Sequence, residues 1–329
     1  SGGEPTIHPQ ILDMIQAAKD RGIRQVMINT NGVRIARDDR FLEGLAKLNP
    51  VVYFQFDGLR SETYQTLRGE DLLDLKMRAL DRLNDAGLDA VLVAAVERGV
   101  NEDEVGPIIE FGLKHPAVRG VVLQPVTHVG RHIDFDPMER VTIPDVIHGI
   151  VDQTNGRFVL EDFVPVPCCF PTCQVNSYVF VDGDTVVPLP RMIDIDHYLD
   201  YITNRTLPNP PNSADVQKAL EGLWSASAVP GTEKAAGDFQ CACGPGMDLG
   251  YELYHLKDHI FQIAIKDFLD AYTFSVKQVM KCCVGILVPD GRIIPFCAYN
   301  SVGYREAIRD QLTLEQAKAP RPAKLQSKV

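Results

Sequence analysis

Residues 1–5 are Ser1-Gly2-Gly3-Glu4-Pro5, and they lie where a strand is expected to end and a helix to begin. Two glycines without Cβ let a ligand approach the backbone closely, Glu4 adds a fixed negative charge, and Pro5 suits the first turn of a helix. This arrangement suits a bound ammonium group. The same residues also suit an ordinary strand-to-helix turn, so the rest of the chain has to decide between the two.

The first half of the chain alternates between two kinds of hydrophobic pattern. Apolar runs predict strands at residues 25–29, 51–56, 90–96 and 118–123. Helical periodicity predicts helices at residues 38–48, 72–86, 101–114 and 143–154, the third with Asn101 as its N-cap. Strict alternation of this kind predicts parallel strands joined by right-handed crossovers, in a barrel or a doubly wound sheet.

Polar residues follow the predicted strands at their carboxyl ends. They are Glu4, Asn31, Gln55, Asp57, Asn101 and Gln124. Ligands bind at this end of parallel α/β sheets. Taken singly, each residue could cap a helix or form a turn, whereas their repetition at one end favours a binding site. The sequence has no Gly-x-Gly-x-x-Gly motif opening a helix and no Walker lysine, which excludes the usual dinucleotide and P-loop patterns.

The pattern changes from about residue 162 onward. Two segments, 179–188 and 286–295, each predict a hairpin with an Asp-Gly turn, and each comes after an adjacent pair of cysteines. They form a weak internal repeat. Between them, residues 247–274 predict one long helix, because Leu249, Leu253, Leu256, Ile260, Ala264 and Phe268 recur at helical spacing.

Eight cysteines all lie in the second half of the chain. They are Cys168, Cys169, Cys173, Cys241, Cys243, Cys282, Cys283 and Cys297. A disulfide-rich secreted domain would be short, whereas a long cysteine-free segment comes first here, so metal binding is favoured. Eight thiolates are enough for two four-ligand iron-sulfur clusters. Zinc is the competing metal, but the usual Cys-x2-Cys knuckles are missing.

Composition and charge restrict the partners. The chain has 329 residues, is 45% hydrophobic and carries a net charge of -11. This acidity argues against nucleic acid as the main partner and against loose docking to an anionic membrane. A lipid substrate would therefore need an apolar pocket. No run of 18 apolar residues occurs that could span a bilayer.

Gly-Gly-Glu-Pro, Asn29-Thr30-Asn31-Gly32 and Gln55-Phe56-Asp57-Gly58, each after a strand, make the chain resemble the radical S-adenosylmethionine enzymes. The resemblance implies a partial (β/α)6 TIM-like barrel and a 4Fe-4S cluster on a three-cysteine loop. It also implies that Gly2, Gly3 and Glu4 contact the amine of the cofactor. Because the cluster loop would precede Ser1, the chain is expected to be an N-terminally truncated fragment, inactive alone.

The resemblance is closer to one group, the archaeal tetraether lipid synthases and their homologues. It runs over nearly the whole chain, Gln124-Pro125 included, and is strongest at Pro289-Asp290-Gly291-Arg292-Ile293-Ile294-Pro295-Phe296-Cys297. It implies carbon-carbon coupling of two isoprenoid lipid tails, with auxiliary iron-sulfur clusters in a Cys-rich C-terminal region. The expected domains are a radical SAM barrel at residues 1–160 and an auxiliary-cluster and substrate region at residues 161–329.

The resemblance completes the expected site. S-adenosylmethionine would be bound by Gly2, Gly3, Glu4, Asn31, Gln55, Asp57, Asn101 and Gln124, and the eight cysteines would hold two auxiliary 4Fe-4S clusters. The expected partners are an isoprenoid diether lipid and an electron donor such as ferredoxin or flavodoxin. A cytoplasmic location is expected, with membrane contact if the substrate is a lipid. The alternatives are a peptide-modifying radical enzyme and a non-catalytic iron-sulfur electron carrier.

Overall fold

A computed structural model describes residues 3–23, 25–129, 136–166, 170–191 and 259–318 of the chain. The chain divides into two compact units. The larger comprises Ser1–Val126 with Asp136–Asp267, and the smaller comprises Thr127–Phe135 with Phe268–Val329. Each unit has its own sheet and its own apolar core.

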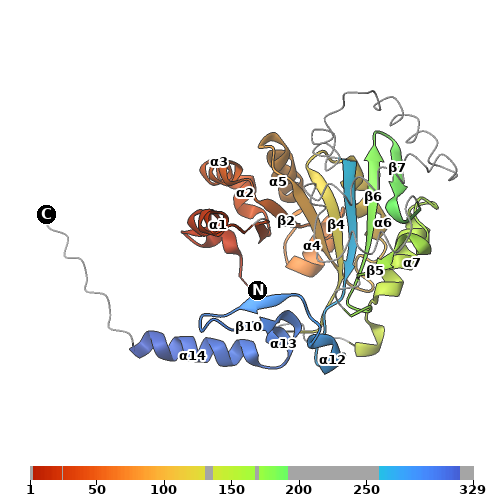
Figure 1. The fold of residues 1–329 in the computed structure, drawn as a ribbon. Coiled ribbons are helices and arrows are strands. Elements are labelled where there is room, and N and C mark those ends of the chain that lie inside the picture. The colour runs from red at the N-terminus through yellow and green to blue at the C-terminus, as the bar shows by residue number, and fades with distance from the viewer. Residues whose placement is uncertain (1–2, 24, 130–135, 167–169, 192–258, 319–329) are drawn as a thin grey trace, which may run out of the picture. The chain divides into compact units, whose positions relative to one another are not determined.

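The larger unit is built on an eight-stranded sheet with the order β1-β2-β3-β4-β8-β6-β5, and β7 pairs with β6 (Figure 1). The strands are β1 Met27–Thr30, β2 Val51–Gln55, β3 Ala90–Val96, β4 Val118–Pro125, β5 Val164–Pro165, β6 Gln174–Asp182, β7 Thr185–Pro188 and β8 Ile260–Lys266. Strands β1 to β4 and β8 are parallel, and β5 to β7 pair antiparallel. Within the described residues β1 and β5 do not pair, so the predicted partial barrel is confirmed.

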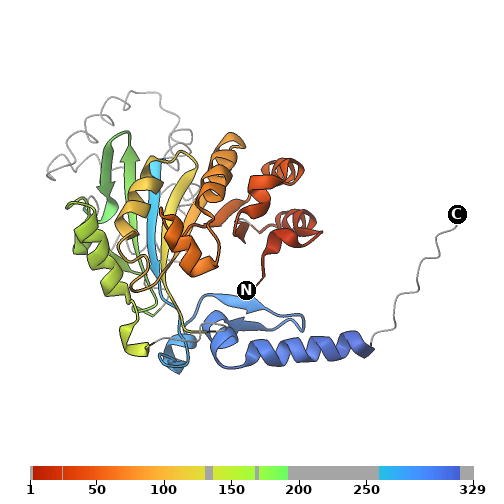
Figure 2. The same ribbon diagram turned by 180° about the vertical axis from the view of Figure 1, so that it is seen from behind.

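Helices connect the parallel strands, as the alternating pattern predicted. They are α1 Ile11–Asp20, α2 Val33–Arg37, α3 Asp39–Leu48, α4 Ser61–Arg68, α5 Leu73–Asp85, α6 Val105–Lys114 and α7 Ile143–Gln153, with short 3-10 turns at η1 Pro5–Ile7, η2 Pro137–Glu139, η3 Leu160–Asp162 and η4 Leu189–Arg191. Asp38 caps α3 by accepting from the Phe41 N–H at 3.0 Å. Figure 2 shows the red helices α1 to α3 at one end of the sheet and the green strands β6 and β7 at the other.

The two faces of the sheet differ in size and chemistry because successive strand residues point to opposite sides. On one face, Leu92, Val121 and Ile263 join the main core, to which the helices contribute their buried apolar side chains, such as Leu80 of α5 and Ile109 of α6. On the other face, Val91, Val122 and Ala264 form a small separate cluster against which Val51 and Tyr53 pack. This second face is the inner face of the partial barrel.

Residues 260–266 correct the prediction of a long helix at 247–274. They form β8, which inserts between β4 and β6. The predicted stripe was ambiguous, because Ile260 and Ala264 are four residues apart and share a face both on a helix and on a strand. The segment forms a strand because its backbone pairs with residues remote in sequence, such as Val122 opposite Ala264. The first part of the predicted helix, through residue 258, lies outside the described residues.

The boundary predicted between residues 160 and 161 passes through the larger unit. Strands β5, β6 and β8 lie beyond it in sequence, yet they belong to the same sheet as β4. The compact units divide instead after Asp267, with the 127–135 segment assigned to the smaller unit. The functional division into a cofactor barrel and an auxiliary-cluster region stays a prediction.

Both predicted hairpins are confirmed. In the larger unit β6 and β7 pair Val181 with Val186 across a turn in which Gly183 has a φ of +56°. The smaller unit contains β9 Gly285–Leu287 and β10 Ile293–Pro295, which pair antiparallel, together with α12 Val276–Val279, α13 Phe296–Ser301 and α14 Tyr304–Lys318. Its core includes Val288, Ile294 and Ile308. No helix in the described parts of either unit is long and apolar enough to cross a membrane.

Candidate functional site

Glu4 is the centre of the predicted cofactor site, and its carboxylate is held by four hydrogen bonds. Its Oε1 accepts from Thr6 N at 3.0 Å, Thr6 Oγ1 at 2.6 Å and Thr30 Oγ1 at 2.7 Å, and its Oε2 accepts from Asn31 N at 2.8 Å. Burial raises the pKa of Glu4, but the four hydrogen bonds together bring it below its ordinary value. Glu4 is therefore a fixed anion that joins the η1 turn to the end of β1.

The Glu4 carboxylate fits an ammonium ligand. Three donors already surround Oε1, whereas Oε2 has one donor among the described residues and can accept another. A Cβ added to Gly3 would meet nothing within 4 Å, so the backbone beside Glu4 is open to close approach. Gly2 lies outside the described residues.

Asn31 follows β1 and connects several parts of the site. Its N–H donates to Glu4 and its Oδ1 accepts from Val33 N at 3.0 Å, at the start of α2. The next residue, Gly32, has a φ of +77°, and a Cβ there would lie 2.2 Å from the Phe54 ring. Only glycine therefore fits this tight turn.

Gln55 ends β2 and contacts a lysine that the sequence analysis did not select. Lys76 of α5 donates to Gln55 Oε1 at 3.2 Å and to the backbone oxygen of Asn31 at 2.7 Å. Lys76 is fully buried, and burial is the main reason why its pKa falls to about 8. The sequence did indicate this lysine, because Leu72, Lys76 and Leu80 recur at a spacing of four, which places a charged residue on the apolar face of α5.

Asp57 is completely buried and its carboxylate is occupied by protein groups. Arg68 Nε donates to Oδ2 at 2.8 Å and Arg68 Nη2 to Oδ1 at 2.7 Å, while Ala95 N donates to Oδ1 at 3.1 Å. This bidentate pair ties the end of β2 to α4 and to β3. Asp57 therefore positions the strand ends.

Asn101 is not the N-cap of α6, which corrects the sequence analysis. Glu104 occupies the N-cap position, and α6 begins at Val105. The Asn101 side chain is instead fully buried, with Nδ2 donating to Asp57 O at 2.7 Å and Ala95 O at 2.8 Å, and Oδ1 accepting from Glu97 N at 2.9 Å. The loop that contains Asn101 packs against the ends of β2 and β3, so the side-chain amide hydrogen-bonds these strand ends and not the N-terminus of α6.

Gln124 ends β4 on the inner face, where its side chain hydrogen-bonds the Tyr53 hydroxyl. Burial raises the pKa of Tyr53, which therefore stays a neutral phenol. Tyr53 lies on β2 and Gln124 on β4, so this contact crosses the inner face over β3. The structure thus brings Glu4, Asn31 and Gln55 together at β1 and β2, and it places Gln124 on the same sheet face as Gln55.

Two buried amides on the inner face have unused hydrogen-bonding atoms. Asn176 of β6 and Gln262 of β8 are 0% and 2% exposed. Among the described residues, Asn176 Nδ2 has no acceptor and Gln262 Oε1 has no donor. Gln174 Nε2 donates to Asn176 Oδ1 at 2.9 Å, and Gln262 Nε2 donates to the Tyr178 hydroxyl at 3.3 Å. A buried donor and a buried acceptor are thus left for a polar partner.

The cysteines are only partly described. Cys168, Cys169, Cys241 and Cys243 lie outside the described residues. In the larger unit, Lys266 Nζ donates to Cys173 Sγ at 2.9 Å, and both side chains are buried. In the smaller unit, Cys297 is buried and Cys283 exposed. Within the described ranges, no three His, Cys, Asp or Glu side chains gather closely enough to hold a metal ion, so the cluster assignment stays a prediction.

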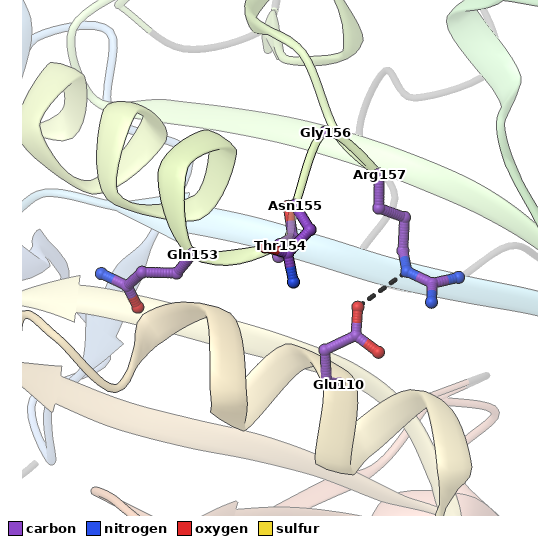
Figure 3. Close-up of a pocket in the computed structure, with 6 residues that line it drawn as sticks. All are labelled: Glu110, Gln153, Thr154, Asn155, Gly156 and Arg157. Carbon is purple, nitrogen blue, oxygen red and sulfur yellow. Dashed lines mark hydrogen bonds and ion pairs between the residues drawn. The ribbon is translucent and has the colours of Figure 1, made fainter.

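A hollow of about 530 Å³ lies apart from the predicted site, between α6 and the end of α7 (Figure 3). It is lined by Glu110, Gln153, Thr154, Asn155, Gly156 and Arg157. Arg157 Nε donates to Glu110 Oε1 at 2.7 Å, and Gln153 Oε1 accepts from Gly106 N at 2.9 Å. None of the predicted cofactor or metal residues lines this hollow.

The chain is similar in sequence to several known proteins. Residues 1–112 match the model of the radical SAM superfamily. The chain is 30% identical to a 7,8-dihydro-6-hydroxymethylpterin dimethyltransferase of Methanocaldococcus jannaschii, over 95% of the chain and 68% of that protein. It is 35% identical to a GTP 3',8-cyclase of Chlorobaculum tepidum, over 38% of each protein. The predicted closeness to tetraether lipid synthases stays a prediction.

One solved structure, a domain of a pyruvate-formate lyase-activating enzyme from Bacteroides vulgatus, aligns with a TM-score of 0.37 and 17% identity, over 47% of this chain and 90% of that one. The dimethyltransferase aligns with nearly the whole chain, and the superfamily match begins at the Gly-Gly-Glu-Pro segment that holds Glu4. The chain therefore belongs to the radical SAM superfamily, and this family implies S-adenosylmethionine and a 4Fe-4S cluster as its cofactors.

Proposed function

We propose that the protein is a radical SAM enzyme that takes hydrogen from unactivated C–H bonds and joins two isoprenoid lipid tails through a carbon-carbon bond. The observation that carries the cofactor half of this proposal is the Glu4 carboxylate. Four hydrogen bonds fix it, its Oε2 can accept one more donor, and the space over Gly3 is open. An anion held in this way binds the ammonium group of an amino acid derivative.

The predicted cofactor residues divide into two roles. Gly2, Gly3 and Glu4 hold the ammonium group, and Asn31, Gln55 and Gln124 face the cofactor from the strand ends. Asp57 and Asn101 are fully buried and bound to protein groups, so they position the strand ends instead. When bound, S-adenosylmethionine and its cluster supply a carbon radical able to abstract hydrogen where no acidic proton exists. The protein holds the reacting carbon in place and excludes water.

The inner face of the sheet supports a hydrocarbon substrate. Beside β2, this face carries the small apolar cluster of Val91, Val122 and Ala264, against which Tyr53 packs. Contact with such apolar side chains favours methylene groups over polar groups. We further propose that the cysteines, Cys173 included, hold auxiliary clusters reduced by a ferredoxin or flavodoxin, and that the protein touches the membrane to reach its lipid.

A second candidate is methylation of a pterin. The methyltransferase relative aligns with 95% of the chain, and the inner face carries the unused donor of Asn176 and the unused acceptor of Gln262. A donor and an acceptor on neighbouring strands match the edge of a heterocyclic amide better than a lipid tail. Both candidates share the cofactor site.

The test uses the full-length protein, purified without oxygen. Iron and sulfide are measured, followed by 5'-deoxyadenosine formation with no substrate, with an archaeal diether phospholipid and with a reduced 6-hydroxymethylpterin. Lipid-dependent turnover with a product of twice the lipid mass less two hydrogens for each bond formed supports coupling, and pterin-dependent turnover with methylated product supports the second candidate. If neither the lipid nor the pterin increases 5'-deoxyadenosine formation above the level without substrate, both candidate functions are overturned.

The matched variants are Glu4→Gln and Glu43→Gln. Both remove one carboxylate charge, but Glu43 is an exposed residue of α3. Glu4→Gln should weaken S-adenosylmethionine binding at least tenfold in calorimetry, because its fixed anion is lost, and Glu43→Gln should leave the affinity unchanged. Equal affinities for the two variants would contradict the proposed cofactor site.

A further inference from the structure

Lys76 occupies a position at which an apolar residue is expected. The other fully or nearly fully buried residues of α5 are Leu75, Ala79, Leu80 and Leu83, and all of them belong to the main apolar core. Lys76 is as buried as they are, with 0% exposure. Burying an ammonium group costs free energy unless its partners compensate, so the contacts of this side chain show what it does.

The Lys76 ammonium points to the carboxyl ends of β1 and β2. It donates to the backbone oxygen of Asn31 at 2.7 Å and to Gln55 Oε1 at 3.2 Å, and it lies 5.4 Å from the centre of the Phe54 ring. One side chain from the helix layer therefore contacts two of the residues predicted to face the cofactor.

The contact with Gln55 sets the orientation of its amide. The ammonium group has only donors, so it must face the amide oxygen. The Nε2 group of Gln55 is then turned away from Lys76 with its two N–H donors available to a ligand. Without Lys76, the amide could rotate and present an acceptor instead.

The contact with Asn31 connects Lys76 to Glu4. The carbonyl of Asn31 accepts from Lys76, and the N–H of the same residue donates to Glu4 Oε2 at 2.8 Å. Asn31 is thus held from both sides, by the cation and by the anion. A shift of its backbone would move the donor on which the position of the Glu4 carboxylate depends.

A purely stabilising role does not explain this lysine. Burial lowers its pKa to about 8, although the nearby carboxylates of Asp57 and Glu4 act in the opposite direction and Arg68 adds to the lowering. A lowered lysine pKa means that the folded protein disfavours the charged side chain at neutral pH. An apolar side chain of similar length would be the more stable choice there.

We propose that Lys76 is a positioning residue of the cofactor site, which orients the Gln55 amide and, through Asn31, holds the Glu4 carboxylate in place for the ammonium group of S-adenosylmethionine. This inference rests on the proposed cofactor site. It gives a role to a residue in the helix layer that no loop motif indicates.

The experiment compares Lys76→Met with Leu83→Ala in the full-length, cluster-loaded protein. Lys76→Met keeps the length of the side chain, whereas Leu83→Ala disturbs the same helix at a core position. For Lys76→Met we expect an unfolding midpoint no lower than that of the wild type and a dissociation constant for S-adenosylmethionine raised tenfold or more. Leu83→Ala should lower the midpoint and leave the affinity within twofold.

A double-mutant cycle with Glu4→Gln then tests the connection through Asn31. If Lys76 acts through Glu4, its replacement should have little further effect once Glu4 is changed, whereas independent effects would add. Should Lys76→Met fail to fold, Lys76→Gln, which keeps a donor without the charge, serves in its place with the same expected loss of affinity.

The outcomes separate this inference from the proposed function. If Lys76→Met binds S-adenosylmethionine within twofold of the wild type, the positioning role is overturned while the cofactor site stands. If its effect adds fully to that of Glu4→Gln, the connection through Asn31 is overturned, and Lys76 acts through Gln55 alone. If the wild type does not bind S-adenosylmethionine, or if Glu4→Gln binds it as tightly as the wild type, the cofactor site itself is overturned.

Discussion

The Arg68 guanidinium binds both carboxylate oxygens of Asp57, at 2.8 Å and 2.7 Å, and Asp57 has no exposed surface. A buried carboxylate without a cation is costly, so removal of the arginine should be worse than removal of the pair. We expect Arg68→Met to lower the free energy of unfolding by about 3 kcal/mol. Denaturant unfolding compares Arg68→Met with the Arg68→Met, Asp57→Leu double variant, and a double variant less stable than Arg68→Met would contradict this account.

Lys76 should make stability rise with pH in the alkaline range. Its pKa is about 8 in the folded protein and 10.5 in the unfolded chain, so between these values the unfolded chain binds more protons. The free energy of unfolding therefore increases from pH 8 toward pH 10.5, as the cost of burying the charge disappears. Lys76→Met should remove this rise, because it removes the titrating group. Unfolding curves at several pH values test this, and the same rise in the variant would count against it.

Glu4 should contribute to stability above its ordinary pKa of 4.5 and lose that contribution in acid, because its folded pKa lies below that value. As pH falls through the folded pKa, protonation removes the charge and weakens the hydrogen bonds that Glu4 accepts from Thr6, Thr30 and Asn31. Glu4→Gln should therefore show a shallower loss of stability below pH 4.5 than the wild type. Glu43→Gln is the control and should keep the wild-type slope, measured by thermal unfolding across the acid range.

Gly32 and Gly69 separate backbone strain from steric overlap. Both have positive φ, +77° and +80°, but a Cβ on Gly32 would lie 2.2 Å from the Phe54 ring, whereas one on Gly69 would meet nothing within 4 Å. Gly69→Ala should cost about 1 kcal/mol from the left-handed backbone alone. Gly32→Ala should cost at least about 2 kcal/mol, because the ring or the turn must also move. Equal losses in denaturant unfolding would show that the Phe54 contact does not matter.

Several features of the protein followed from sequence alone, because they depend on neighbours in the chain. Continuous apolar runs located the strands at 90–96 and 118–125, and a period-3.6 pattern located the helix at 143–153, to within one or two residues. The Asp-Gly turns located both hairpins. Glycine, glutamate and proline in succession indicated the capped turn in which Glu4 receives the N–H of Thr6.

Other features needed the tertiary structure, because their partners are far apart in sequence. Residues 260–266 form a strand since β4 and β6 supply hydrogen bonds that a helical stripe cannot reveal. The Asn101 side chain donates hydrogen bonds to the backbone oxygens of Asp57, after β2, and Ala95, in β3, instead of capping α6. Lys76 reaches Asn31 and Gln55 only because α5 packs beside β1 and β2. The sequence determined which segments become strands and turns, and long-range packing decided which side chains meet at their ends, since burial and charge pairing exist only in the assembled fold.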